Sequence, residues 1–542
     1  MVIEKQVKEN LLASSRAMAE VCAKGIGPDV VIIVSSTTNQ ADFWQGHLTA
    51  GDNVHSSGAN VKRDTIVLSV TESNWAGGAG NGLGTLNGFL QAARKARELS
   101  LIDAKDEDLI DAFLGYSKGK SVFMYHTAGK GTRMAPLPGA ECNSKPNIKL
   151  PKIVEDDGKR RPITILEAVL METSVYAPSR KNRLSVFWGD QIVINELNVS
   201  FEGKHHIEIF GELMPLTESI KDYGVLIPTE AHDCMQREKL SIEEVKALLP
   251  EGKSEVYRSI GSFTVSLAFL KALLGMDYNK EYLAKAEGEI NTDPDWWQPL
   301  TSTREEYVTA MTKKGIDEEE AASRWDEMDE MWQKFSGSDS FNESGLDHKF
   351  GFNDVGENSL WWDYGQNLYY LEGMRMISSA SAQGEIARSF LGIDENAWID
   401  ELSDVKDAEV TDSVVQDSKI EGGKLVNCVV VNSYLKNVVA KDAVIISSYV
   451  LDLNAQGALC YNVVDKRIEL DKGKALVNIF HPEKGRIPMM TDVSRDGKAD
   501  WKNKELIYDN TYTYPQVADL MKDVAMDVSE EVKKKEIEKL KP

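Results

Sequence analysis

The first half of the chain alternates short apolar runs with segments of helical periodicity. Buried strands of a parallel sheet are short, β-branched and apolar on both faces. Runs of this kind occupy residues 29–36, 64–71, 121–125, 183–190 and 257–266. Helical periodicity occupies residues 2–24, residues 41–49 and a segment that begins at about Thr85. This alternation predicts an α/β fold with a Rossmann-like, mostly parallel sheet.

Residues 293–345 have a different pattern. They are acidic and helical, and Trp325, Met328 and Trp332 share one helix face because they are three and four residues apart. Further candidates for burial are Tyr307 and Met311. We interpret the region as a helical insertion that packs on the main domain. A surface for a partner or for oligomerisation is the alternative.

A third pattern begins at about residue 408. Apolar positions recur there in steps of six, as in Val414, Ile420 and Val426. This period predicts flat strands that coil into a short left-handed parallel β-helix of two to three coils, with a β-sandwich as the alternative. A surface or dimer-contact helix is expected at the end of the chain, over residues 516–540. The domains expected are an α/β domain over 1–395, a β-helix over 396–490 and a helical tail over 491–542.

The composition narrows the possible functions. The 542 residues carry a net charge of −24, and so acidic a surface repels nucleic acid. The five cysteines form no CxxC pair, which gives no sign of a zinc site or a disulfide framework and favours the cytosol. The N-terminal residues mix charged with apolar side chains, so we expect neither a secretion signal nor a membrane span.

Residues 126–146, HTAGKGTRMAPLPGAECNSKP, form a glycine-rich loop after the buried run SVFMY. Glycines let backbone N–H groups approach phosphate oxygens closely, and Arg133 and Lys145 add positive charge where pyrophosphate would leave. The loop matches neither a Walker P-loop, which needs GxxxxGK(S/T), nor the GxGxxG dinucleotide fingerprint. It therefore indicates a nucleotide-binding loop of another kind, with a purely structural loop as the alternative.

The loop resembles the signature of sugar-1-phosphate nucleotidylyltransferases, GxGTR(L/M)xPL followed by KP, with a slightly longer spacer before the KP pair. The matching residues are Gly129, Gly131, Thr132, Arg133, Met134, Pro136, Leu137, Lys145 and Pro146. The resemblance implies transfer of a nucleotidyl group from a nucleoside triphosphate to a sugar 1-phosphate, with release of pyrophosphate and with Mg²⁺ as cofactor. Arg133 and Lys145 would act in catalysis, and the nucleotide would bind at Gly129, Gly131 and Thr132.

Two aspartates are the candidate magnesium ligands. Asp190 follows the strand LSVFW, and a carboxylate at the C-terminal end of a parallel strand points into the crevice where α/β sheets bind ligands. Mg²⁺ prefers one or two carboxylates together with substrate phosphates. Asp190 and Asp363, in WWDYG, resemble the family's metal-binding aspartates, although Gln366 replaces the usual threonine. Core packing with a capping carboxylate is the alternative for Asp363.

Weaker resemblances concern the sugar and a second lysine. Tyr223 and Gly224 resemble the short strand that contacts substrate in the family, and Gly261 resembles a segment that lines the sugar pocket, without its asparagine. The EKP motif, which usually supplies a second phosphate-binding lysine, is absent from the sequence. Lys149 and Lys221 are the candidates for that role.

A second glycine-rich stretch, GGAGNGLGTL, comes before the signature loop. Together with the H-T-x-G-x-x-x-R pattern that starts at His126, it resembles the fucose-1-phosphate guanylyltransferase branch of the family. This resemblance implies that Gly80, Gly82 and Thr85 help to bind the nucleotide. A strand-to-helix turn without ligand contact is the alternative.

The histidines carry no sign of metal binding. His126 ends a buried strand, where we expect a hydrogen-bonded structural role. His205, His206 and His348 have no partners at the spacing typical of metal ligands. The only metal site that the sequence predicts is therefore the magnesium site.

We thus expect a cytoplasmic, homo-oligomeric enzyme whose partners are a nucleoside triphosphate and a sugar 1-phosphate, and neither nucleic acid nor a membrane. One alternative is a catalytically inactive regulatory or binding subunit of the same fold. Degenerate relatives usually lose the arginine, the lysine or one of the two metal-binding aspartates. This chain retains all four residues: Arg133, Lys145, Asp190 and Asp363. Another alternative is a broad-specificity UDP-sugar pyrophosphorylase.

Overall fold

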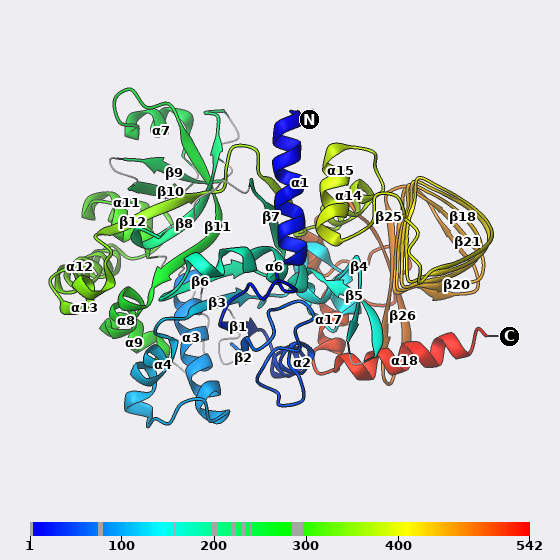
Figure 1. Cartoon of the computed structure of the whole chain (residues 1–542), viewed down its shortest axis with the longest axis horizontal. Coiled ribbons are helices and arrows are strands. Elements are labelled where there is room, and N and C mark those ends of the chain that lie inside the picture. Colours follow the sequence, from blue (N-terminus) through cyan, green and yellow to red (C-terminus); the bar gives the residue numbers. More distant parts are fainter. Residues whose placement is uncertain are drawn as a thin grey trace.

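The structure is a computed structural model (Figure 1). It describes residues 4–73, 80–156, 158–196, 203–217, 221, 223–229, 233–238, 240–284 and 296–541. Within these ranges, none of the helices has both the length and the apolar character needed to cross a membrane.

A nine-stranded mixed sheet forms the centre of the α/β part (Figure 1). Its parallel half is, in spatial order, β2 (Ile66–Thr71), β1 (Val30–Ser35), β3 (Ser121–His126) and β6 (Arg183–Trp188). The other half contains β11 (Val256–Ser266), β8 (His205–Met214), β12 (His348–Asp354), β9 (Gly224–Pro228) and β10 (Cys234–Glu238). The five predicted strands are confirmed within two residues at each end. The prediction of a mostly parallel sheet holds only for the first half, because β11 runs antiparallel to β6, β8 and β9.

Hydrophobic cores cover both faces of the sheet, which explains why its strands are continuous apolar runs. Along β1, Val31 and Ile33 enter one core, whereas Val30, Ile32 and Val34 enter the other. The first core receives α1 (Lys5–Glu20), α2 (Thr38–Leu48) and α6 (Ile165–Thr173). The second receives α3 (Gly80–Glu98), α4 (Leu109–Ser117) and α8 (Leu267–Gly275). Helix α3 begins five residues before the predicted start at Thr85.

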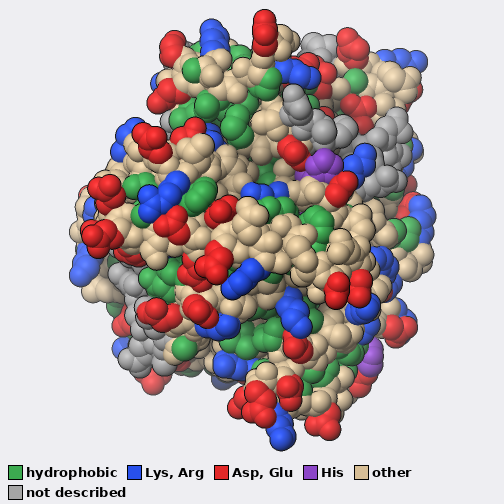
Figure 2. Space-filling model, turned by 90° about the vertical axis from the view of Figure 1, so that its left-hand side faces the viewer, with side chains coloured by type: hydrophobic (Ala, Val, Ile, Leu, Met, Phe, Trp, Pro, Cys, Tyr) green, Lys and Arg blue, Asp and Glu red, His purple; other side chains and the backbone are tan. Residues whose placement is uncertain are grey.

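The insertion, which precedes β12 along the chain, contains α10 (Trp297–Thr301), α11 (Arg304–Lys313), α12 (Glu318–Ser336) and α13 (Asp339–Ser344). Met328 is buried in the second core, and Trp332 packs against that core while partly exposed. Tyr307 and Met311 are buried in a small cluster, against which Trp325 packs. Figure 2 shows the side of the molecule on which these helices lie, with acidic and basic side chains scattered among small hydrophobic areas. The apolar residues of the insertion thus face inward.

The region after residue 404 is a coil of parallel strands at the end of the molecule opposite the insertion (Figure 1). One of its sheets includes β14 (Asp404–Thr411), β16 (Lys419–Val426) and β18 (Tyr434–Lys441). A second sheet includes β15 (Val414–Gln416), β17 (Val429–Val431), β19 (Val444–Ile446) and β22 (Leu459–Tyr461). Every one of these pairings is parallel, unlike those of an antiparallel β-sandwich. The left hand of the coil stays a prediction.

The repeat of the coil is fifteen residues rather than six. Val414, Val429, Val444 and Leu459 pair in turn, so the stack has at least four levels where two to three coils were predicted. A step of six does separate Val429 from Leu435, but the next equivalent position follows after nine residues. Asparagine and aspartate adopt positive φ at the corners, as at Asn427 and Asp442, because they tolerate the left-handed conformation. A Cβ atom at Gly423 would lie 1.9 Å from the Val438 carbonyl oxygen, so the stacking requires glycine there.

The end of the chain returns to the α/β part. After the hairpin of β25 (Lys474–His481) and β26 (Gly485–Asp492) come α16 (Gly497–Asn503), α17 (Tyr514–Met521) and α18 (Met526–Glu538). The prediction of one helix over 516–540 is therefore wrong. Between α17 and α18, the carbonyl of Asp523 accepts a hydrogen bond from Asn39, and Val524 is buried in the first core. These tertiary contacts interrupt the helix.

Candidate active site

A cavity of about 270 Å³ opens where β3 and β6 end. Most residues of the sequence-predicted signature line it. Its lining includes Gly129, Gly131, Thr132, Arg133, Lys145 and Asp190, together with His126, Trp188, Gly365 and Lys498. The carboxyl ends of parallel strands are where α/β sheets bind ligands.

The glycine-rich loop is held to the sheet and closely packed. The N–H group of Gly129 donates a hydrogen bond of 2.8 Å to the Ser36 hydroxyl, directly after β1. Gly131 has φ of +57°, and a Cβ atom there would lie 3.0 Å from Pro138 Cγ and 3.3 Å from Lys145 Cβ. A side chain at residue 131 would therefore push against Lys145. Glycine here fixes the loop and the lysine together.

Two cations and two carboxylates meet in and beside the cavity. Lys145 begins a short 3₁₀ helix (Lys145–Asn147) and forms an ion pair with Asp190. Arg133 lies on the turn Thr132–Met134 and is exposed. Its guanidinium is close to Gly365, since a Cβ atom on that glycine would lie 3.4 Å from Arg133 Nη2. Positive charge therefore faces the cavity from two directions.

A short antiparallel pair of strands brings the two aspartates together. Asp190 directly precedes β7 (Gln191–Ile194), and Asp363 ends β13 (Leu360–Asp363), opposite Gln191. The N–H group of Tyr364 donates to the Asp190 carbonyl at 3.2 Å. Burial, together with the negative charge of Asp190, raises the pKa of Asp363. Two converging carboxylates of this kind are suited to a divalent cation, because the cation removes their mutual repulsion.

Lys498 is a cavity residue that sequence reasoning missed. It is the second residue of α16, and Gly497 before it packs on the signature loop. A Cβ atom at Gly497 would lie 2.5 Å from the Thr132 carbonyl oxygen, so glycine allows the helix to approach the loop. No local motif marks Lys498, since its place depends on the folding of the whole C-terminal segment.

The two lysines predicted for a second phosphate contact lie elsewhere. Lys149 Nζ donates to Glu141 Oε1 at 2.9 Å, and the same oxygen accepts a hydrogen bond of 2.6 Å from Tyr461. This buried network joins the signature loop to the coil. Lys149 is therefore paired with Glu141 in this network. Neither Lys149 nor Lys221 is among the residues that line the cavity.

The upstream glycine-rich stretch contacts a cavity residue through Thr85. The Thr85 hydroxyl lies 3.0 Å from His126 Nε2, and the His126 ring packs on Trp188 with 5.7 Å between centroids. Burial lowers the pKa of His126 to about 4, so the ring is neutral at pH 7 and takes the expected hydrogen-bonding role. Gly80 and Gly82 begin α3 but do not line the cavity. Residues 74–79 of this stretch lie outside the described part of the chain.

The residues predicted to bind sugar are connected to the cavity indirectly. Gly261 has φ of +86°, and a Cβ atom there would lie 2.4 Å from Nε1 of Trp188, which lines the cavity. The ring of Tyr223 lies 5.4 Å from the Arg258 guanidinium, which in turn lies 4.9 Å from the Trp361 ring on β13. Neither Tyr223 nor Gly224 lines the cavity.

Comparison with known proteins does not assign the chain to a family. No protein-family model matches it, and no curated protein matches it. Among solved structures, it is similar to the crystal structure of mannose-1-phosphate geranyltransferase from Thermus thermophilus over 74% of this chain and 98% of that one, with 13% identity and a TM-score of 0.27. At this level of similarity, a functional conclusion rests on the geometry of the cavity.

Two of the histidines that show no metal-like spacing along the chain come together in the fold. His205 and His348 lie beside Asp233 at the starts of β8 and β12, whereas the cavity opens where β3 and β6 end. The three residues are distant in sequence, so ligand spacing along the chain could not indicate them. His206 points elsewhere, with Nδ1 2.8 Å from the Ser266 hydroxyl and its ring among aromatic side chains.

Proposed function

We propose that this protein transfers a nucleotidyl group from a nucleoside triphosphate to a sugar 1-phosphate and releases pyrophosphate. One observation carries the proposal. Arg133, Lys145 and Asp190 come from separate segments, yet they line one cavity beside a glycine-rich loop. Asp363 does not line the cavity but lies next to it, since its carboxylate accepts a hydrogen bond of 2.7 Å from the N–H group of Gly365, which does. A cavity that combines two cations, a carboxylate with a second one beside it, and a glycine-rich loop suits a reaction between two phosphate esters.

In the proposed reaction, an oxygen of the sugar phosphate attacks the α-phosphorus, and the bond to the bridging oxygen of the β-phosphate breaks. The sugar phosphate is already ionised and nucleophilic, so the enzyme needs neither a general base nor a covalent intermediate. Catalysis then consists of positioning and charge neutralisation. The loop around Gly129 and Gly131 would hold phosphate oxygens through backbone N–H groups.

The charged side chains divide this work. Arg133 and Lys145 would stabilise the departing pyrophosphate, and Lys498 would add a third positive charge. Asp190 and Asp363 would hold Mg²⁺, which when bound neutralises charge on the reacting phosphates. The ion pair between Lys145 and Asp190 holds both side chains beside the cavity, where substrate would supply other partners.

For the substrates, we propose the fucose-1-phosphate guanylyltransferase-like branch. The contact between Thr85 and His126 supports this choice, because it joins the two glycine-rich stretches on which that resemblance depends. All five cysteines are free thiols, which supports a reducing compartment such as the cytoplasm. Homo-oligomerisation stays a prediction.

The test is pyrophosphate release in the presence of Mg²⁺, with GTP, UTP, CTP, ATP and dTTP crossed against fucose, mannose, glucose and N-acetylglucosamine 1-phosphates. We expect one strongly preferred pair, with GTP and fucose 1-phosphate first among the candidates. Activity with UTP and many sugars would instead identify a broad UDP-sugar pyrophosphorylase. Nucleotide binding without turnover on any sugar would favour the inactive regulatory subunit and contradict the proposal.

A further inference from the structure

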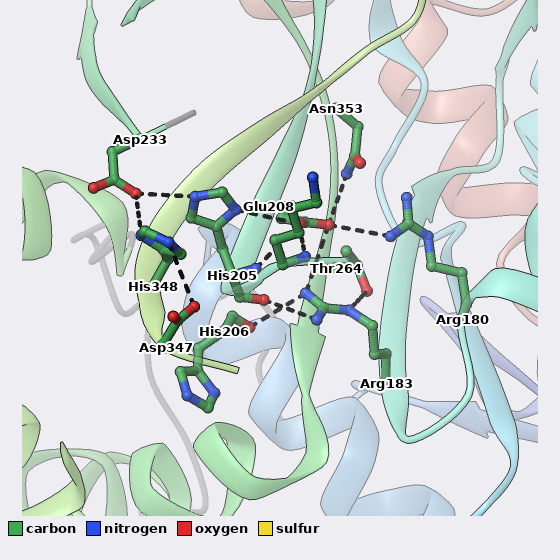
Figure 3. A network of polar contacts seen from close by, with 11 residues as sticks. Arg180, Arg183, His205, His206, Glu208, Asp233, Thr264, Asp347, His348 and Asn353 are labelled. Atoms are coloured by element: carbon green, nitrogen blue, oxygen red, sulfur yellow. Dashed lines mark hydrogen bonds and ion pairs between the residues drawn. The ribbon is translucent and has the colours of Figure 1, made fainter. Parts of the chain in front are cut away.

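Two histidines and an aspartate converge at the starts of strands in the antiparallel half of the sheet (Figure 3). His205 is the first residue of β8 and His348 the first of β12, and they are register partners in this parallel pair. Asp233 directly precedes β10 and forms an isolated bridge with Gly351 of β12. One ligand atom from each of the three side chains lies within 4.8 Å of the other two.

Each of the two histidine rings has a carboxylate oxygen beside both of its nitrogens, so the cluster needs additional positive charge. Asp233 Oδ1 lies 2.9 Å from His205 Nε2 and 3.2 Å from His348 Nδ1. The second nitrogen of each ring also faces a carboxylate, at 3.4 Å from Glu208 Oε1 for His205 and 3.4 Å from Asp347 Oδ1 for His348. A neutral imidazole has only one N–H group, so it can satisfy only one of its two carboxylates.

Both rings face the same Asp233 oxygen, and the ring centroids of His205 and His348 are 5.0 Å apart. A single divalent cation placed between the two nitrogens and the Asp233 oxygen would supply positive charge to all three side chains. It also leaves each ring neutral, with one N–H group for its outer carboxylate.

We propose that His205 Nε2, His348 Nδ1 and the Asp233 carboxylate bind a divalent transition-metal ion of the zinc class. Two imidazoles and one carboxylate are a common ligand set for Zn²⁺, whereas Mg²⁺ prefers oxygen ligands alone. Metal–ligand bonds of about 2.0–2.1 Å place tetrahedral ligand atoms about 3.3 Å apart. The observed separations of 2.9 and 3.2 Å are close to that value. A water molecule would complete the tetrahedron.

A buried carboxylate behind His205 orients the ring for metal binding (Figure 3). Glu208 accepts hydrogen bonds from the Lys204 and His205 backbone N–H groups and pairs with Arg180 at 3.1 Å. Arg183 is a second guanidinium beside this carboxylate, at 3.8 Å. Paired with two arginines, the Glu208 carboxylate accepts the Nδ1–H of His205 at 3.4 Å, which leaves the Nε2 lone pair for a metal.

Backbone packing fixes the ring as well. A Cβ atom at Gly351 would lie 2.4 Å from Cε1 of His205, so any side chain at residue 351 would displace the imidazole. Arg183 holds the His205 carbonyl with a hydrogen bond of 2.8 Å from Nη1. The first ligand is thus positioned before any ion binds.

The proposed site is distinct from the magnesium site. β6 and β8 both run antiparallel to β11, so they run in the same direction. Asp190 follows the end of β6, whereas His205 begins β8, which places the two sites at opposite edges of the sheet. The ion would tie the starts of β8 and β12 to the segment before β10. The inference does not depend on the proposed reaction.

The test is a zinc titration of the untagged full-length protein after removal of metal with a chelator, read by competition with a chromophoric chelator. We expect one tight site that excess Mg²⁺ does not displace, and with Co²⁺ an intense visible spectrum typical of tetrahedral coordination. His348→Ala and Asp233→Asn should each weaken zinc binding at least a hundredfold. His55→Ala, which removes an exposed histidine paired with Asp52, should leave the affinity unchanged.

Circular dichroism and thermal melting of the variants would verify that they are folded. Equal zinc affinity in the wild-type protein and in folded His348→Ala would overturn the proposal, as would the absence of a tight site in the wild-type protein. Neither readout involves nucleotide or sugar, so a failure here would leave the proposed transferase activity intact, and the reverse also holds.

Discussion

The two polar clusters lie at opposite edges of one sheet and differ in how their charges are satisfied. At the cavity, the Arg133 side chain is exposed, and Lys145 forms an ion pair with the Asp190 carboxylate. These charged groups are therefore available to new partners. At the histidine cluster, Glu208 and Arg183 are buried and held by several hydrogen bonds each. The first arrangement suits groups that exchange partners during a reaction. The second suits groups that must keep one geometry.

The largest effect is expected from Asp190→Ala. Loss of this carboxylate removes a proposed magnesium ligand and the Asp190 partner of Lys145, so kcat should fall on the order of a thousandfold. Steady-state pyrophosphate release with the productive substrate pair measures it. Asp452→Ala, which removes an exposed carboxylate on the coil, is the matched control and should retain normal turnover. Near-normal turnover of Asp190→Ala would show that the metal ligands are assigned wrongly.

Arg133→Ala should come next. Removal of one electrostatic stabiliser of the leaving pyrophosphate costs about 3 kcal/mol, which is roughly a hundredfold in kcat. Stability should change little because the side chain is exposed. Lys130→Ala is the control, since Lys130 is a neighbouring exposed cation that does not line the cavity. If the two variants lost activity equally, general surface charge rather than Arg133 would account for the effect.

Glu208→Gln tests the other cluster. The amide no longer supplies a negative charge behind His205, so zinc affinity should fall about 10- to 100-fold while the transferase activity persists. A zinc titration and the pyrophosphate assay on the same preparation measure both quantities. Glu212→Gln, four residues along the same strand, should keep the wild-type zinc affinity. Parallel loss of activity and zinc affinity would contradict the independence of the two sites.

The smallest effect is expected from Lys498→Ala. One exposed cation at the cavity should contribute about tenfold to kcat/KM for the triphosphate, chiefly through KM. Lys502→Ala, on the same helix but outside the cavity lining, serves as the control. Equal kinetics for wild type and Lys498→Ala would show that Lys498 does not contribute to the proposed site.

The sequence pattern predicted those strands and loops whose form depends on neighbouring residues in the chain. The strand that ends at His126 is a continuous apolar run because both of its faces are buried, and the glycine signature identified Arg133 and Lys145, which line the cavity. Lys498 could not be predicted, because it reaches the cavity only through the packing of Gly497 on Thr132. The pairing of His205 with His348 depends on strand register, which is set by the whole sheet. The division of the C-terminal helix depends likewise on the burial of Val524.

The fifteen-residue repeat also sets the distance between the two ends of the coil. Parallel strands are about 4.8 Å apart, so each added or deleted coil would move everything after it by that distance. The early coils contact the α/β part through β4 (Lys149–Asp156), whereas α16 and Lys498 follow the last coil. An added level that continued the pairing of β15, β17, β19 and β22 would contain fifteen residues. Even one such level would move Lys498 away from the glycine-rich loop around Gly131, beside which it now lies.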